Sequence, residues 1–201
     1  MTTTALRVVL IGGTSNVGKS TVARLLADRL GFDCRTTDTL ARHPGRPWRT
    51  PGREVPAHVA EHYRSLPVEE LTASVLGHYE RLWPMIEELV TGYAQGDGPG
   101  LALEGSALWP SRVAALTTPG TAALWLTAEP AVLRARIRRG GGYPEATEDE
   151  RALMDAFLAR TVRYQELMLA EVTALGLTRL APPAEQSPER TAAAILGTLT
   201  V

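Results

Sequence analysis

The chain alternates between short apolar runs and longer amphipathic segments. Five short runs are typical of strands, at residues 6–11, 32–37, 101–105, 121–127 and 177–180. Apolar residues that recur every three or four positions predict helices, at residues 22–30, 56–66, 67–95, 110–116, 131–139, 147–175 and 188–199. Strands that alternate with helices predict an α/β fold, in which helices cover both faces of a five-stranded parallel sheet in three layers.

Two stretches interrupt this alternation. Residues 43–56 (HPGRPWRTPGREVP) contain four prolines and two glycines, which predicts a loop. We expect residues 43–95 to form a helical insertion over the carboxyl edge of the sheet, within a single domain that spans residues 1–201. Residues 140–144 (GGGYP) are not expected to hold regular structure, and we expect a mobile lid loop over residues 139–148.

A glycine-rich turn joins the first predicted strand to the first predicted helix. Residues 13–20 (GTSNVGKS) fit G-x-x-x-x-G-K-[ST] at every fixed position. In this pattern, glycines let backbone N–H groups turn toward phosphate oxygens, and the helix presents the positive end of its dipole. Lys19, the only lysine of the chain, can reach the outer phosphates, and the Ser20 hydroxyl can bind Mg²⁺.

This turn resembles the phosphate loop of P-loop nucleotide-binding proteins. The resemblance implies that the chain binds ATP, or alternatively GTP, together with Mg²⁺. The nucleotide-binding residues that it implies are Gly13, Thr14, Ser15, Asn16, Val17, Gly18, Lys19, Ser20 and Thr21. A chance glycine turn that happens to contain lysine is the alternative, but the strand before it and the helix after it argue against chance.

Two acidic residues follow predicted strands at the carboxyl edge, where open α/β sheets bind their ligands. Asp38 comes just after the second strand, where it would face the terminal phosphate and position or deprotonate an acceptor hydroxyl. Its alternative role is to cap the helix that follows. Glu104 follows three apolar residues, as the acid of a Walker B strand does, so we expect it to bind Mg²⁺ with Ser20. The alternative for Glu104 is a solvated strand end.

The segments around these acids resemble P-loop kinases that act on small molecules. Residues 37–40 (TDTL) resemble the acidic segment after the second strand in chloramphenicol phosphotransferase, shikimate kinase and gluconate kinase. Residues 103–110 (LEGSALWP) and the start of the phosphate loop resemble 2-phosphoglycerate kinases, although Ala107 stands where that family tends to have histidine. The resemblance implies a P-loop kinase fold and transfer of a phosphoryl group to a small molecule. It does not cover residues 43–95, so it does not identify the acceptor.

Arginines flank the glycine-rich loop of residues 139–148 on both sides. This pattern resembles the lid of nucleoside monophosphate kinases, in which arginines close on the transferring phosphoryl group. The catalytic candidates that it implies are Arg136, Arg139 and Arg160. Such arginines would stabilise developing charge once the closing lid excludes water. The arginines expected only to solvate helix faces are Arg134, Arg138 and Arg163.

Four arginines and no acidic residue lie between positions 42 and 53. A solvated loop often carries charge, but guanidinium groups also bind carboxylate or phosphate with two parallel hydrogen bonds. Trp48, among these arginines, could stack on a ring. The candidate acceptor-binding residues are therefore Asp38, Arg42, Arg46, Trp48, Arg49 and Arg53. They favour a small, anionic acceptor.

Charge and composition exclude several other classes of function. The formal net charge of −1 gives no electrostatic footprint for nucleic acid or an anionic membrane. No apolar stretch approaches the roughly 18 residues of a membrane span, and the N-terminus does not resemble a signal peptide. The single cysteine, Cys34, excludes an internal disulfide, and its place in a predicted strand suggests a buried side chain. We therefore expect a cytoplasmic protein, and the sequence carries no oligomerisation signature.

Together these patterns favour an ATP- and Mg²⁺-dependent kinase that phosphorylates a hydroxyl of a metabolite or antibiotic-like molecule. A nucleoside monophosphate kinase is the nearest alternative, favoured by the lid pattern but weakened by an acid where such enzymes bind an acceptor phosphate. A regulatory ATPase or nucleotide-dependent switch is an alternative of a different class. It is less favoured because the sequence shows no partner motif for such a switch.

Overall fold

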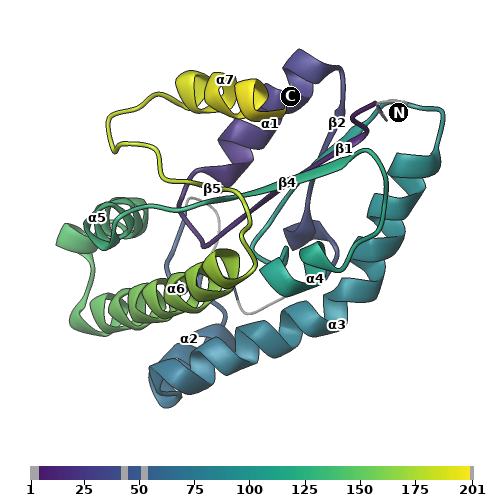
Figure 1. Cartoon of the computed structure of the whole chain (residues 1–201). Helices are drawn as coiled ribbons and strands as arrows, with labels where there is room; N and C mark the ends of the chain where they lie inside the picture. Colours follow the sequence, from purple (N-terminus) through teal and green to yellow (C-terminus); the bar gives the residue numbers. More distant parts are fainter. Residues whose placement is uncertain (1–4, 42–44, 51–53, 200–201) are drawn as a thin grey trace.

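In the computed structural model, which describes residues 5–41, 45–50 and 54–199, five strands form one parallel sheet. The strands are β1 (Val8–Gly13), β2 (Asp33–Thr36), β3 (Leu101–Glu104), β4 (Thr121–Leu126) and β5 (Arg179–Leu180). Their order across the sheet is β2-β3-β1-β4-β5, and every neighbouring pair is parallel. Helices lie on both faces of the sheet (Figure 1), so the predicted three-layer α/β fold is confirmed.

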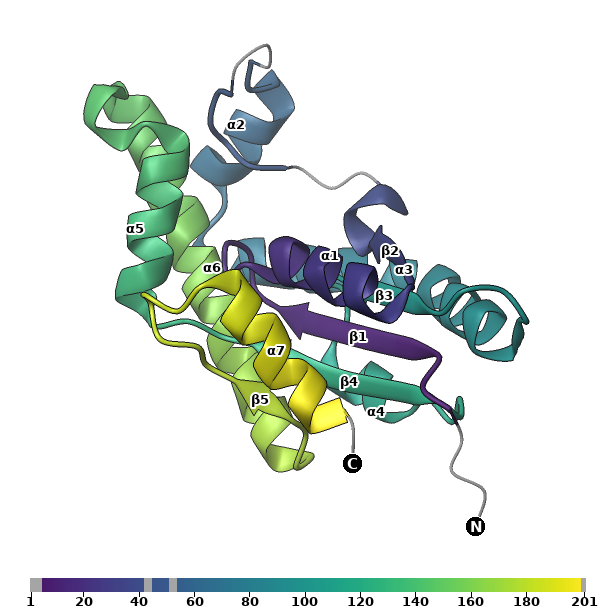
Figure 2. The same cartoon turned by 90° about the horizontal axis from the view of Figure 1, so that it is seen from above.

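Alternation along the central strand β1 explains why both faces need a cover. Val9 and Ile11 belong to one buried apolar cluster, whereas Val8 and Leu10 belong to another on the opposite face. The first cluster includes side chains of α1 (Lys19–Leu30) and α7 (Pro188–Leu199), which lie side by side in Figure 2. The second includes side chains of α3 (Val68–Gln95), α4 (Pro110–Ala114) and α6 (Glu148–Ala174).

The helices of the insertion, residues 43–95, pack against α6. The first of them, α2 (Ala57–Ser65), contacts α6 through the Tyr63 ring, whose centroid lies 5.8 Å from that of Phe157. At the surface, Arg64 donates two hydrogen bonds to the Asp149 carboxylate, of 2.9 and 3.1 Å from Nη2. No helix in the described ranges is both long and apolar enough to cross a membrane.

The structure corrects the prediction that residues 140–144 lack regular structure. Helix α5 (Pro130–Gly141) continues through two of the three glycines, and Gly142 ends it with φ 64°. A Cβ atom at Gly141 would lie 2.5 Å from the Met154 sulfur, so glycine lets α5 approach α6 closely. Residues Tyr143–Glu145 form a 3₁₀ turn, and Thr147 then caps α6 in a capping box with Glu150.

Contacts of Tyr143 hold this connection in place. Its hydroxyl donates a 2.7 Å hydrogen bond to Asp155, and the Arg138 guanidinium lies 4.1 Å from its ring centroid. Arg138 also pairs with Asp155 at 3.1 Å. Side-chain contacts therefore stabilise the turn that connects α5 to α6.

The expectation that Cys34 is buried is also wrong. The residue lies on β2, which is the edge strand of the sheet that the described residues form. The Cys34 side chain is exposed, so it does not serve as a small apolar residue of the core.

Candidate active site

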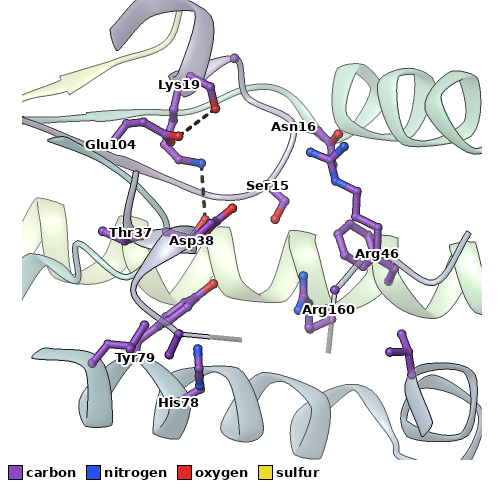
Figure 3. Close-up of a pocket in the computed structure, with 18 of the residues that line it drawn as sticks. Ser15, Asn16, Lys19, Thr37, Asp38, Arg46, His78, Tyr79, Glu104 and Arg160 are labelled. Carbon is purple, nitrogen blue, oxygen red and sulfur yellow. Dashed lines mark hydrogen bonds between the residues drawn. The ribbon is translucent and has the colours of Figure 1, made fainter. Parts of the chain in front are cut away.

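A cavity of about 820 Å³ opens beside the carboxyl ends of β1 and β3. Residues from the glycine-rich turn, the segment after β2, α2, α3 and α6 line it, as Figure 3 shows for its labelled side chains. Its polar lining residues include Lys19, Ser20, Asp38, Arg46, His78, Tyr79, Glu104, Ser106 and Arg160. The structure therefore gathers in one space residues that are far apart in the sequence.

The glycine-rich turn has the backbone shape that its sequence predicts. Gly13 has φ 137°, and a Cβ atom there would lie 2.4 Å from the Leu126 carbonyl oxygen of the neighbouring strand β4. Gly18 has φ 101° at the start of α1, and Asn16 between them has φ 65°. Glycine is thus required at two positions of the turn by backbone geometry alone. The turn leads directly into a helix N-terminus, which is where proteins bind phosphate.

Lys19 is buried at the base of this turn, with only 7% of its surface exposed. Its ammonium donates hydrogen bonds to the Thr14 carbonyl oxygen at 2.8 Å and to the Ser106 hydroxyl at 3.4 Å. Burial lowers the pKa of Lys19, an effect that Arg46 reinforces and that Glu104 and Asp38 oppose. No carboxylate among the described residues forms an ion pair with it, so an anion would supply the missing counter-charge.

Ser20 and Glu104 form the polar contact on which a metal assignment depends. The Ser20 hydroxyl donates a 2.9 Å hydrogen bond to Glu104 Oε1, and Glu104 is 6% exposed at the end of β3. Across the described ranges, no cluster of three His, Cys, Asp or Glu residues could hold a metal ion. One hydroxyl and one carboxylate fit Mg²⁺, which usually keeps several waters and takes phosphate oxygens as its other ligands.

Asp38 lies in a 3₁₀ turn (Thr37–Thr39) that follows β2 directly. Thr36 caps this turn, because its hydroxyl accepts a 3.3 Å hydrogen bond from the Asp38 backbone N–H. The capping role considered for Asp38 is therefore filled by another residue. The Asp38 side chain is exposed and lines the cavity together with the glycine-rich turn.

Two of the three candidate lid arginines lie close to the cavity. Arg136 Nη1 donates a 3.0 Å hydrogen bond to the Asn16 carbonyl oxygen and so contacts the glycine-rich turn. Arg160 lines the cavity, is 6% exposed, and lies 4.5 Å above the centroid of the Phe157 ring. Its Nε atom has no hydrogen-bond partner among the described residues. Arg139 is exposed and lies outside the set of residues that line the cavity.

The acceptor-binding candidates separate into three groups. Arg46 lines the cavity, whereas Arg42 and Arg53 lie outside the described residues. Trp48 is 4% exposed, and its ring packs edge-on against Phe157 at 4.9 Å, so it is a core residue rather than a stacking surface for a ligand. Arg49 points away from the cavity and pairs with Glu150 at 2.9 Å. A proline-rich loop has no periodicity that would reveal which side chains turn inward.

Tyr79 and Ser106 line the cavity although no sequence motif indicated a role for them. Tyr79 has the spacing of an apolar helix face, yet it lines the cavity, and its burial raises the pKa of its phenol to about 12. Ser106 follows Glu104 closely and provides the hydroxyl that accepts from Lys19. The Tyr164 hydroxyl in turn donates to the Ser106 carbonyl oxygen, which ties this loop to α6.

Comparison with models of known protein families gives no match, and comparison with curated proteins gives none either. Solved structures do match over nearly the whole chain. An unliganded sugar kinase from Janibacter sp. HTCC2649 is 19% identical with a TM-score of 0.57, covering 96% of this chain and 93% of that one. A gluconokinase from Sinorhizobium meliloti 1021 is 20% identical with a TM-score of 0.56, covering 98% and 94%. The chain has the fold of the P-loop small-molecule kinases.

A third kinase with this fold supports the same conclusion. Shikimate kinase from Aquifex aeolicus vf5 is 14% identical with a TM-score of 0.54, and the match covers 96% of this chain and 95% of that one. The three proteins are similar to this chain in the arrangement of the whole domain. The P-loop kinase fold expected from residues 13–20 and 103–110 is thereby confirmed.

Proposed function

We propose that this chain is a kinase that uses ATP and Mg²⁺ to phosphorylate a hydroxyl of a small molecule, such as a metabolite or an antibiotic-like alcohol. The observation that carries the proposal is that Lys19, Ser20 and Glu104 line the same cavity as Asp38. Phosphoryl transfer needs a phosphate-binding loop and a group that positions the nucleophile around one space. The kinase neighbours of the fold support the general class.

Each residue has a definite part in this proposal. The amides of residues 13–19 and the Lys19 ammonium would bind the phosphates, and Ser20 and Glu104 would hold Mg²⁺. MgATP, when bound, supplies the phosphoryl group and neutralises part of its negative charge. Asp38 would accept a hydrogen bond from the acceptor hydroxyl and then its proton. These contacts involve phosphates only, so GTP would fit this part of the site as well as ATP.

The acceptor is proposed to be anionic because of Arg160. Its guanidinium is nearly buried and forms no ion pair with another described residue. A buried charge without a partner is costly, so a carboxylate or phosphate on the acceptor would stabilise this part of the cavity. His78 and Tyr79 line the cavity with Asp38, and their side chains would contact the rest of the acceptor.

A nucleoside monophosphate kinase is the second candidate. Arg46 and Arg160 both line the cavity, which would suit the phosphate of a nucleotide acceptor. Asp38 disfavours this candidate, because a carboxylate beside the reacting group would repel an acceptor phosphate.

A thermal-shift panel tests the proposed function. Mg²⁺ with a non-hydrolysable ATP analogue should raise the melting temperature, and sugar acids, aminoglycosides and phenicol-like alcohols should be screened for further stabilisation. Compounds that stabilise the protein should then accept labelled phosphate from ATP. Stabilisation by a nucleoside monophosphate alone would favour the second candidate. Absence of any nucleotide effect would contradict both.

A further inference from the structure

We propose that Arg46 contacts the phosphoryl group that is transferred, and that Trp48 positions Arg46 for this contact. The assignment rests on the proposed kinase function. Arg46 belongs to the insertion and is a predicted acceptor-binding residue. Here it is assigned to the transferred phosphate instead.

The placement of Arg46 carries the first step. Arg46 lines the cavity with Ser15, Asn16 and Lys19, and in Figure 3 its guanidinium extends toward the side of the cavity formed by the glycine-rich turn. Its positive charge is near enough to Lys19 to contribute to the lowered pKa of that residue. The guanidinium carbon lies 5.8 Å from the centroid of the Trp48 ring, and the guanidinium forms no hydrogen bond or ion pair with another described residue, so its donors remain available to an anion.

The residues that follow Arg46 explain how it is held there. Pro47 and Trp48 are buried, and the Trp48 ring meets the Phe157 ring edge-on at 4.9 Å. Arg49 turns outward and pairs with Glu150 at 2.9 Å, close to the N-terminus of α6. Successive residues of this short segment thus line the cavity, enter the core and reach the surface. The buried contact of Trp48 with Phe157 of α6 holds the backbone from which Arg46 extends, whereas the Arg49 side chain is 58% exposed and its ion pair contributes little.

Phe157 links Arg46 to the second cavity arginine. The Phe157 ring meets the Trp48 ring, and the Arg46 guanidinium lies 5.8 Å from the centroid of that Trp48 ring. The Arg160 guanidinium lies 4.5 Å above the Phe157 ring itself. One aromatic ring on α6 therefore contacts Arg160 directly and Arg46 through Trp48. Arg160 is nearly buried, as the proposed anionic acceptor requires, whereas Arg46 is exposed at the opening of the cavity.

The chemistry of phosphoryl transfer gives Arg46 a task that Lys19 cannot perform alone. Charge is spread over three oxygens of the group in transit, and a planar guanidinium can donate two parallel hydrogen bonds to them. Lys19 is buried at the base of the turn and acts as a point charge from one side. A guanidinium at the opening would contact the oxygens that face away from Lys19.

Nucleotide affinities measured by calorimetry test the proposal without a known acceptor. Arg46→Ala should weaken binding of a Mg²⁺-bound, non-hydrolysable ATP analogue by about tenfold, while the affinity for MgADP, which lacks the last phosphate, changes less than about twofold. Arg49→Ala is the matched control, because it removes an arginine three positions away that points out of the cavity. It should leave both affinities unchanged.

The other outcomes overturn the assignment. If Arg46→Ala weakened the binding of both nucleotides equally, or weakened neither, the result would contradict a contact between Arg46 and the transferred phosphoryl group. Wild-type protein that binds neither nucleotide would instead contradict the proposed kinase function itself, so the two failures are distinguishable.

A separate test distinguishes positioning of Arg46 by Trp48 from a purely structural role of Trp48. Trp48→Leu should cause the same selective loss for the ATP analogue, and Trp48→Phe, which keeps an aromatic edge, a smaller one. In the double variant with Arg46→Ala, Trp48→Leu should add no further loss, because both changes remove the same contact. Additive losses, or equal losses for both nucleotides, would overturn the positioning role.

Discussion

The Ser20 hydroxyl donates a 2.9 Å hydrogen bond to the Glu104 carboxylate, and this contact joins the start of α1 to the end of β3. The two residues are 84 positions apart in the sequence. Parallel pairing of β1 with β3 brings Ile11 beside Glu104, which places the acid next to the glycine-rich turn. The contact therefore depends on the sheet order as well as on the local motif.

Replacing Glu104 by glutamine tests the metal assignment. The amide keeps the volume of the side chain but removes the charge, so the gain in nucleotide affinity on adding Mg²⁺ should fall by at least about tenfold. Affinity measured with EDTA should not decrease. Glu88→Gln, a change of an exposed acid on α3, is the control. An equal loss with and without Mg²⁺ would argue that Glu104 has only a structural role.

Replacing Asp38 by asparagine tests the role proposed for its carboxylate. Nucleotide affinity should be preserved, because Asp38 lies after β2 and outside the glycine-rich turn. The transfer rate to an acceptor found in the thermal-shift panel should fall by about 10²–10⁴-fold. Asp28→Asn, on an exposed face of α1, should leave the rate unchanged. An undiminished transfer rate in Asp38→Asn would show that the Asp38 carboxylate has no role in phosphoryl transfer.

Gly105 lets the end of β3 approach the turn that carries Asp38. A Cβ atom at Gly105 would lie 1.8 Å from the Thr37 hydroxyl oxygen, and Thr37 is itself buried. Gly105→Ala should therefore lower the free energy of unfolding by about 1–3 kcal/mol, measured by chemical denaturation. Gly98→Ala is the control, because nothing lies within 4 Å of the added carbon. Equal stability of the two variants would contradict the close approach.

The half-buried phenol of Tyr79, whose pKa is raised, predicts a loss of stability at alkaline pH. Its pKa rises from 10.0 to about 12 on folding, so above pH 10 the unfolded chain releases a proton that the folded protein retains. The free energy of unfolding should then fall between about pH 10 and pH 12, the window set by these two values. Tyr79→Phe should reduce this loss in urea titrations. Part of the loss of stability should remain in this variant, because the pKa values of Tyr63 and Tyr164 are also raised.

An alkaline profile of Tyr79→Phe identical to that of the wild type would contradict the burial of this phenol. The variant should be compared at neutral pH first, so that any general change in packing is separated from the effect of titration.

Local patterns were sufficient to predict the sheet and the glycine-rich turn. Residues 13–20 form a turn between strand and helix because glycine is needed where φ is positive, at Gly13 and Gly18. Glu104 could be placed from three apolar residues before it, since an apolar strand that ends in an acid has few other interpretations. In each case the signal lies within a few residues of the feature that it predicts.

Features set by distant contacts could not be predicted in this way. Trp48 turns into the core because Phe157 lies opposite, and nothing near residue 48 in the sequence indicates this. Helix α5 continues to Gly141, where Met154 of α6 leaves no room for a side chain, and only the distant residue reveals this contact. Tyr79 lines the cavity and packs edge-on against Tyr164 of α6, a contact that helical periodicity alone leaves open.

In the proposed function, Lys19 and the amides around it bind the phosphates of a nucleoside triphosphate. Calorimetric titration of the wild type and of Lys19→Ala with a Mg²⁺-bound, non-hydrolysable ATP analogue measures this binding, with circular dichroism to show that the variant is folded. We expect binding to the wild type and a loss of at least about 100-fold in the variant, because Lys19 supplies the buried charge at the base of the turn. Equal affinities, or no binding to the wild type, would contradict the account.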